Sequence, residues 1–295
     1  MRYNANLLPN RNRRRWLQAA LAMGGCALAS PGRALDGQPP LRVGMTPAFL
    51  HDQHAVLDQW RRFMAADLAR PVDFVQRDSY RETMDLLRLA KLDFAWICDY
   101  PYLHLKDEVR LLAVPLYQGR PAYRSYLIVR ADNRAVTSIA DLAGKVFAYA
   151  DPYSNTGYLS PRYALRELGH DPNTFFRKTF FTWSHRKVVE AVASGLAQGG
   201  AVDSFVWDSL TRVAPQLTAR TRIVTRSPEY GFPPFVAHRN VSDADFALMQ
   251  RHLLNMEKTE PGRELLVSLH LDGFIEGSPA LYEDVAKMMR VFGEA

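Results

Sequence analysis

The sequence has 295 residues, of which 47% are hydrophobic and 23% charged, as expected of a folded chain with two domains or lobes. Its formal net charge of +6 arises entirely in residues 1–34, which contain six arginines and no acidic residue, so the rest of the chain carries equal numbers of basic and acidic residues. This zero balance excludes the strongly basic surface typical of nucleic-acid binding. No apolar stretch reaches the roughly 20 residues that a membrane-spanning helix needs.

Residues 1–34 have the features of an export leader that is cleaved. An arginine pair precedes an aromatic residue and a leucine at residues 13–17, an arrangement that resembles the twin-arginine export motif. A short apolar run follows at residues 19–29, and small residues offer cleavage after Ala29 or after Ala34. The sequence therefore predicts export to the periplasm, with the general secretion route as an alternative.

The chain contains two cysteines, Cys26 and Cys98. Removal of the leader leaves Cys98 without a partner for an internal disulfide bond. The residues before Cys26 also resemble a lipobox, at which a bacterial lipoprotein is lipidated. Lipidation of Cys26, which would keep the protein on the membrane, is thus an alternative to complete removal of the leader.

After the leader, short apolar runs alternate with helical patterns, which predicts an α/β fold. Ser79 and Glu82 form a capping box at the start of one of the predicted helices. In this first part we expect helices at residues 51–69 and 79–90, and strands at residues 41–45, 71–76, 93–97, 109–117 and 123–130.

The alternation begins again after residue 139. We expect strands at residues 146–149, 176–181, 201–206, 221–225 and 235–238, the last two returning to the first lobe. We expect helices at residues 139–144, 157–168, 184–196, 243–256, 260–269 and 280–292. Two α/β units joined by two extended crossings form a hinged cleft, with residues 35–125 and 235–295 in the first lobe and residues 126–234 in the second.

The loop at residues 151–159 contains three small polar residues, Ser154, Asn155 and Thr156, just before a predicted helix. Their side chains, together with the free N–H groups of the first helical turn, can surround a tetrahedral anion. The same residue types also favour an ordinary helix cap. The loop alone therefore leaves an anion site and a simple cap as alternatives.

The same loop resembles that of the periplasmic binding proteins for phosphate, phosphite and phosphonate of ABC transporters, which reads roughly Asp-Pro-x-Ser-x-Ser-Gly-Tyr-Leu. Further segments agree with this family in order and spacing, at residues 78–80, 92–96, 141–145, 184–185, 194–195 and 272–274. The resemblance covers about residues 41–281. It implies the two-lobed periplasmic-binding-protein fold of type II, with two α/β lobes joined by a two-segment hinge.

The resemblance also implies a function, in which a small phosphate-like oxyanion, a phosphonate or phosphite, is bound by hinge closure and delivered to an ABC permease. It implies no cofactor. The ligand contacts carried over from the family fall on Tyr80, Tyr123, Ser154, Asn155, Thr156 and His185. His185 can donate a hydrogen bond to the anion, and a helix-capping role is its alternative.

Two further residues are candidates for the ligand site. Asp203, at the end of a predicted strand, can accept a proton from a monoprotonated ligand or pair with a ligand amine, and it would repel sulfate; a structural cap is the alternative. Cys98 ends the apolar strand at residues 93–97 and is either a packing residue or a soft ligand for arsenite. An arsenite ligand would make the protein a periplasmic sensor that partners a membrane histidine kinase.

Enzyme activity is not expected. The sequence has no recognisable catalytic signature, phosphate-binding Walker loop or dinucleotide glycine motif, and no cluster of histidine, cysteine and acidic residues that predicts a metal site. The sequence therefore predicts a binding protein without chemistry of its own.

Export predicts a shortened N-terminus. Because the small residues before the predicted cleavage points fit a leader peptidase, the exported protein should begin near Ser30 or Leu35, which intact-mass spectrometry of the periplasmic fraction will show. A full-length chain in the cytoplasm would contradict the prediction. A diacylated Cys26 at the N-terminus would support the lipoprotein alternative instead.

Overall fold

The structure is a computed structural model that describes residues 39–46 and 54–294. The predicted leader, with its arginine pair and Cys26, lies outside the described residues, as does the beginning of the helix predicted at residues 51–69. Within the described part of the chain, no helix is long and apolar enough to cross a membrane.

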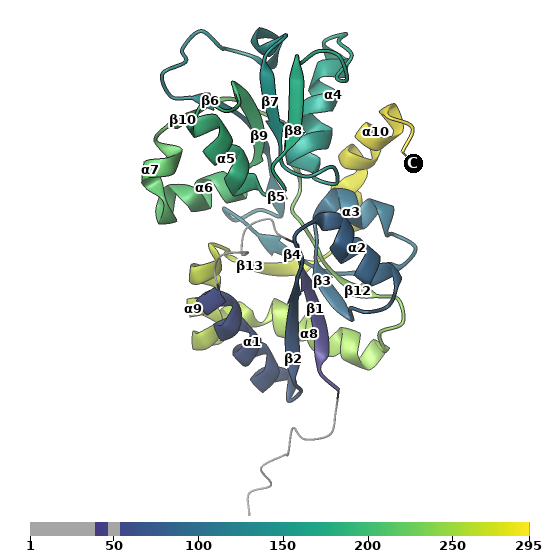
Figure 1. Cartoon of the computed structure of the whole chain (residues 1–295). Coiled ribbons are helices and arrows are strands. Elements are labelled where there is room, and N and C mark those ends of the chain that lie inside the picture. Colours follow the sequence, from purple (N-terminus) through teal and green to yellow (C-terminus); the bar gives the residue numbers. More distant parts are fainter. Residues whose placement is uncertain (1–38, 47–53, 295) are drawn as a thin grey trace, which may run out of the picture. The chain divides into compact units, whose positions relative to one another are not determined.

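The first lobe is built on a six-stranded sheet with the order β13-β4-β12-β3-β1-β2 (Figure 1). β1 is parallel to its neighbours β2 and β3, whereas β12 and β13 run antiparallel to β4. The strands are β1 (Leu41–Met45), β2 (Val72–Gln76), β3 (Phe94–Trp96), β4 (Val109–Leu116), β12 (Phe235–His238) and β13 (Gly273–Glu276).

Among the described residues, eight helical segments belong to this lobe. α1 packs against both α8 and α9, and α10 contacts α3 of this lobe as well as α4 of the second. The segments are α1 (His54–Leu68), α2 (Tyr80–Arg88), α3 (Asp99–His104), α8 (Asp243–Leu254), η3 (Met256–Lys258), α9 (Glu260–Leu269), η4 (Pro279–Tyr282) and α10 (Glu283–Val291). In the core, the fully buried Trp60 ring meets Trp96 edge-on at 5.9 Å and Phe235 at 5.6 Å.

The second lobe has a five-stranded sheet with the order β10-β6-β9-β7-β8. Its strands are β6 (Ser125–Arg130), β7 (Val146–Tyr149), β8 (Lys178–Phe181), β9 (Gly199–Asp203) and β10 (Thr221–Arg226). The helical segments are η1 (Ile139–Leu142), η2 (Asn155–Leu159), α4 (Ser160–Glu167), α5 (His185–Ala193), α6 (Ser204–Val213) and α7 (Pro215–Thr218). Alternate residues of β6 enter two different cores, Tyr126 and Ile128 on one face and Leu127 and Val129 on the other, so this sheet is buried on both faces.

The two lobes are connected by the paired strands β5 (Ala122–Tyr123) and β11 (Tyr230–Gly231), which are antiparallel. The chain thus crosses between the lobes twice, side by side, as the predicted two-segment hinge requires. The α/β fold class is confirmed. The residue limits assigned to each lobe stay a prediction.

The structure differs from the sequence analysis in three respects. The strand predicted at residues 201–206 exists, but its bounds are wrong, because β9 begins at Gly199 and ends at Asp203, whose side chain caps α6. Glycine at position 200 weakens the strand pattern, yet a side chain there would lie 2.6 Å from Val188 of α5, which packs closely on β9. β10 pairs with β6 and therefore belongs to the second sheet, not to the first lobe. The helices α3, α6 and α7 and the strand β13 were not predicted.

The capping box predicted before α2 is present in a modified form. The Ser79 hydroxyl accepts a hydrogen bond from the N–H of Glu82 at 3.3 Å. The Glu82 carboxylate reaches back to the N–H of Asp78, one residue before the cap, at 3.1 Å. α2 therefore begins at Tyr80, which places this side chain at the junction between the lobes.

Candidate functional site

All eight predicted site residues come together between the two sheets, just after strands of both lobes end. Tyr80 and Cys98 follow β2 and β3, Tyr123 lies on the hinge strand β5, and the other five follow or end β7, β8 and β9. Each is no more than 5% exposed. Ligands of open α/β sheets bind at the carboxyl ends of the strands, so this is the candidate ligand site. That these residues contact a ligand stays a prediction.

The three small polar residues form the start of a helix with a wide first turn. Ser154 is the cap, and its hydroxyl accepts a hydrogen bond from the Gly157 N–H at 3.0 Å. The next five residues form one π-helical turn, a wider turn that frequently occurs at functional sites. A side chain at position 157 would lie 2.9 Å from both His185 and Ser154, so only glycine fits here. We call Ser154, Asn155 and Thr156 the anion loop.

His185 is hydrogen-bonded to the anion loop through Ser154. Its Nδ1 accepts a hydrogen bond from the Asp203 N–H at 3.1 Å, which assigns the ring hydrogen to Nε2, 3.1 Å from the Ser154 hydroxyl. Burial lowers the pKa of His185 to about 3, so the ring is neutral. The Ser154 hydroxyl oxygen accepts hydrogen bonds from both His185 Nε2 and the Gly157 N–H. Its own hydrogen is therefore free to bond to another group. Both ring nitrogens of His185 contact protein groups, so its direct donation to an anion stays a prediction.

Asp99, which the sequence analysis missed, joins the first lobe to the anion loop. This fully buried carboxylate accepts hydrogen bonds from the Asn155 amide at 2.8 Å, the Tyr123 hydroxyl at 2.9 Å and the Tyr100 N–H at 2.8 Å. The thiol of Cys98 donates to it as well, at 2.9 Å. The Tyr123 hydroxyl therefore donates its hydrogen bond to Asp99 and can only accept a hydrogen bond from any other group.

Asp151 is a second missed residue, and it joins the lobes in the opposite direction. From the second lobe, its carboxylate accepts a hydrogen bond from the N–H of Tyr80, the first residue of α2, at 3.1 Å. Its other oxygen accepts from the Tyr153 N–H at 2.7 Å. The side chain of Tyr80 is buried against Cys98 and Tyr153. Asp151 and Asp203 follow a strand and precede a helical segment, and Asp99 is the first residue of α3, shortly after β3. This position at a strand-to-helix junction is the signal that would have identified the two missed residues.

The site therefore contains three buried carboxylates, Asp99, Asp151 and Asp203, and no described lysine or arginine forms an ion pair with any of them. Burial raises the pKa of Asp203 to about 8, that of Asp99 to about 6 and that of Asp151 above its usual value. Each is stabilised instead by N–H groups at the start of a helix, where the helix dipole is favourable to negative charge. The electrostatics disfavour a fully ionised dianion.

Two polar atoms of the anion loop are buried without a partner, Thr156 Oγ1 and Asn155 Oδ1. Buried polar atoms usually have hydrogen-bond partners, so these two atoms are available to a further group. The Asn155 amide nitrogen faces the Asp99 carboxylate, which leaves its oxygen as an acceptor. The loop therefore offers one free hydroxyl and one free acceptor, in addition to the free hydrogen of Ser154.

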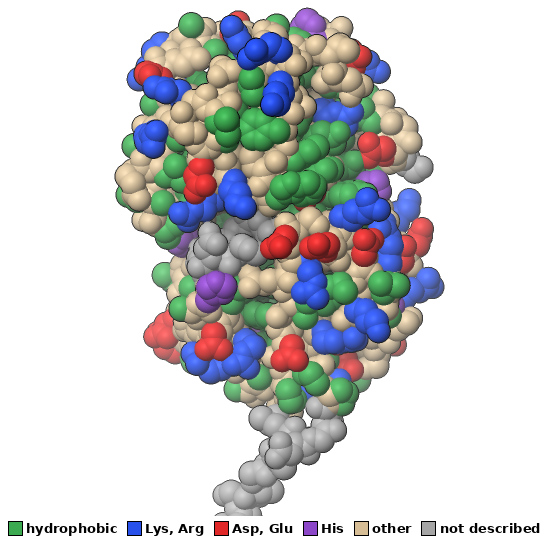
Figure 2. Space-filling view, in the orientation of Figure 1, with side chains coloured by type: hydrophobic (Ala, Val, Ile, Leu, Met, Phe, Trp, Pro, Cys, Tyr) green, Lys and Arg blue, Asp and Glu red, His purple; other side chains and the backbone are tan. Residues whose placement is uncertain are grey.

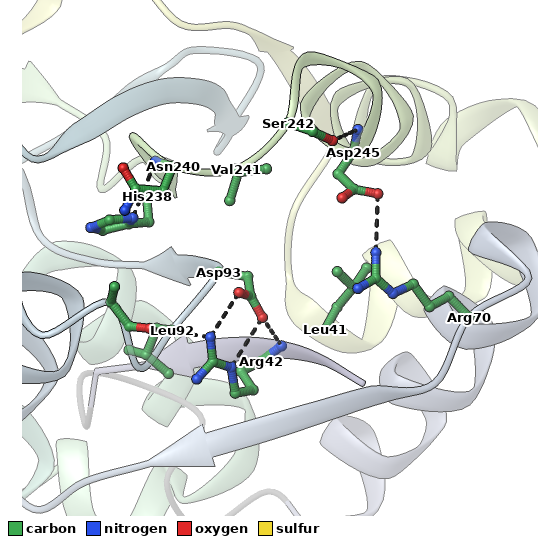
Figure 3. A pocket seen from close by; sticks show the side chains of 11 residues that line it. Leu41, Arg42, Arg70, Leu92, Asp93, His238, Asn240, Val241, Ser242 and Asp245 are labelled. Atoms are coloured by element: carbon green, nitrogen blue, oxygen red, sulfur yellow. Dashed lines mark hydrogen bonds and ion pairs between the residues drawn. The ribbon is translucent and has the colours of Figure 1, made fainter. Parts of the chain in front are cut away.

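A second polar pocket, of about 340 Å³, lies at the opposite end of the first sheet (Figure 3). Its two arginines are paired with carboxylates, Arg42 with Asp93 at 2.9 Å and Arg70 with Asp245 at 3.1 Å. The pocket lies where β1 begins rather than where the parallel strands end. The candidate ligand site is therefore the one between the lobes. Within residues 39–46 and 54–294, no three histidine, cysteine or acidic side chains are placed to hold a metal ion.

The fold and the buried anion loop define a class, the two-lobed solute-binding proteins. The family model for phosphonate-binding periplasmic substrate-binding proteins of ABC transporters matches residues 43–282, and the chain belongs to this family. A probable ABC transporter phosphite-binding protein of Prochlorococcus marinus is 21% identical over 267 residues, which cover 85% of this chain and 89% of the relative.

Solved structures agree on the fold. A binding protein component of an ABC phosphonate transporter from Pseudomonas aeruginosa matches with a TM-score of 0.80 at 20% identity, covering 87% of each chain. A Prochlorococcus marinus protein in complex with methylphosphonate matches with a TM-score of 0.77 at 20% identity, covering 86% of this chain and 98% of that one. The predicted type II fold and the predicted family are confirmed.

Asp203 should make the ligand-free protein less stable as the pH rises from about 6.5 to about 8. Its folded pKa of about 8 exceeds the value of about 3.9 in an unfolded chain. The folded state therefore holds a proton that the unfolded state lacks, which gives a slope of up to about 1.4 kcal/mol per pH unit. His185 acts in the opposite sense only below about pH 6.5, because its folded pKa is lowered.

Urea unfolding at several pH values measures this slope. Asp203→Asn keeps an oxygen to cap α6 and should flatten the slope, whereas Asp171→Asn, at an exposed aspartate, should leave it unchanged. An equal slope in wild type and Asp203→Asn would contradict a protonated Asp203.

Proposed function

We propose that the anion loop binds a small phosphorus oxyanion, a phosphonate or phosphite, for delivery to an ABC permease. The observation that carries the proposal is the unpartnered, fully buried Thr156 hydroxyl at the start of a helix, beside the free hydrogen of Ser154. Such a helix start is a ready-made anion site. The relatives named above, one a probable phosphite-binding protein and one in complex with methylphosphonate, support this ligand class.

The charge of the site favours a ligand that brings its own proton. Burial raises the pKa of Asp203 to about 8, so an ionised Asp203 readily accepts the proton of the ligand, and Asn155 Oδ1 is a further acceptor. A monoprotonated phosphonate or phosphite can satisfy these acceptors, whereas sulfate has no proton to donate and meets buried carboxylates. Asp203 is thus the residue that selects the ligand by its protonation.

Closure of the lobes is the proposed mechanism. Tyr80 and Tyr123 come from the first lobe and its hinge strand, whereas the anion loop, His185 and Asp203 come from the second. A ligand held by both sets stabilises the closed form, because only that form makes all of the contacts. His185 fixes the direction of the Ser154 hydroxyl and is a positioning residue. The chain is exported to the periplasm, needs no cofactor and carries out no chemistry.

The arsenite-sensor alternative is disfavoured by the state of Cys98. The thiol is buried and donates to the Asp99 carboxylate, and burial beside this charge raises its pKa well above the usual value. A protonated thiol is a poor ligand for a soft metal or metalloid centre. Cys98 therefore acts as a hydrogen-bond donor that holds Asp99.

The two hydroxyls should dominate the affinity. Removing a donor to a charged group costs about 1.5–3 kcal/mol, so Ser154→Ala and Thr156→Ala should each weaken binding of methylphosphonate or phosphite by a factor of ten or more. Isothermal titration calorimetry measures this, with Ser194→Ala as the control because its hydroxyl bonds within α5 and its C-cap. Unchanged affinity in variants that still fold would show that the loop is only a helix cap and does not bind the anion.

Cys98→Ser separates the two ligand classes. The serine hydroxyl can also donate to Asp99, so affinity for methylphosphonate or phosphite should stay within about threefold of wild type. Thermal shift with each oxyanion and with arsenite, on both proteins, provides the measurement. Stabilisation by arsenite that depends on Cys98, with no response to a phosphorus oxyanion, would overturn the proposal in favour of the sensor.

A further inference from the structure

A further pocket, of about 430 Å³, is lined by residues next in sequence to the anion loop, and we call it the aromatic pocket. Its lining residues are chain neighbours of the residues of the inner site. Tyr100 follows Asp99, Tyr153 precedes Ser154, Tyr158 follows Gly157, and Trp183 lies two residues before His185. The aromatic pocket is therefore built by the same strand-to-helix junctions as the inner site.

Tyr153 forms a wall shared by the two sites. On one side its ring packs against the buried pair Tyr80 and Cys98. On the other side it meets the rings of His104 at 5.7 Å and Tyr100 at 6.3 Å. Tyr153 is thus the residue that both packs against the buried pair and lines the aromatic pocket.

Trp183 presents an exposed ring to this pocket. Its side chain is 46% exposed, although large aromatic residues are usually buried. Its backbone has φ +62°, a left-handed conformation that is costly for a bulky residue. The N–H of Trp183 is held by the carbonyl of Ala150 at 2.7 Å, which keeps the strained backbone in place. Strain of this kind concentrates at ligand sites.

The charged groups around the pocket already have partners. Glu294 accepts a hydrogen bond from the Tyr100 hydroxyl, and Arg81 pairs with Asp85 at 3.8 Å. On the face shown in Figure 2, hydrophobic side chains gather on the second lobe near β8 and α4, opposite charged side chains over α2 of the first. The pocket therefore presents aromatic ring surface to a ligand, whereas its charged groups are already paired.

We propose that the aromatic pocket is a subsite for a flat, unsaturated ring carried by the ligand, so that the protein prefers aryl-substituted phosphorus oxyanions to simple alkyl ones. This inference rests on the proposed function of the anion loop. Aromatic rings pack favourably against tyrosine and tryptophan faces, and burial of the ring removes apolar surface from water. Three partly exposed aromatic side chains, Tyr153, Tyr158 and Trp183, supply the contacts.

Calorimetry with methylphosphonate and phenylphosphonate tests the inference. Wild type should bind phenylphosphonate about tenfold more tightly, the gain expected for one buried ring pair. Phenylphosphonate should also change the fluorescence of Trp183, an exposed tryptophan. Binding of methylphosphonate with no gain for the phenyl group would overturn the aromatic subsite alone. Binding of neither compound would overturn the proposed function itself.

Trp183→Gly separates ligand binding from folding. Glycine relieves the left-handed backbone, so this variant should be at least as stable as wild type, bind methylphosphonate within twofold and lose most of the preference for phenylphosphonate. Ala90→Gly is the matched control, because Ala90 also has a left-handed backbone (φ +51°) but lies at the other end of the first lobe. It should retain the tenfold preference. A preference that survives in Trp183→Gly would overturn the subsite.

Discussion

The structure depends on three carboxylates that are buried without a cation. Asp99, Asp151 and Asp203 are each stabilised by donors at the first turn of a helix, where N–H groups lack intrahelical partners. Two of these aspartates reach across the cleft, Asp151 to the start of α2 and Asp99 to the amide of Asn155. The contacts that join the lobes and the contacts that shape the anion loop are therefore made by the same side chains.

A site of neutral donors beside buried acids recognises its ligand differently from one built on arginines. An arginine attracts every small anion, whereas hydroxyl and N–H donors next to a carboxylate favour only those anions that also supply a hydrogen. The neutral ring of His185 fits this arrangement, because its hydrogen goes to Ser154 and adds no positive charge. Under the proposed function, the selectivity of the protein comes from the balance of donors and acceptors around the anion loop.

The sequence predicted most of the strands and the residues of the anion loop, because period-two and helical patterns and the capping box before α2 are local signals. It did not predict α6, since the apolar residues on both sides of Asp203 continue the pattern of β9 and only the cap ends the strand. It did not predict β13, whose pairing with β4 is supplied by the rest of the sheet. Asp99 and Asp151 were missed because each also binds a donor of the opposite lobe, Asn155 and Tyr80 respectively, and local patterns do not place such a partner.

The strand order also determines how the chain assembles. The second sheet is made from one continuous stretch, residues 125–226, whereas β12 has to insert between β3 and β4, from which the whole second lobe separates it in the chain. During synthesis the second lobe can complete its sheet while β3 and β4 still have open edges, and such edges are templates for wrong pairing. The half-made first lobe is thus the stage of biogenesis at which this protein most needs protection from aggregation.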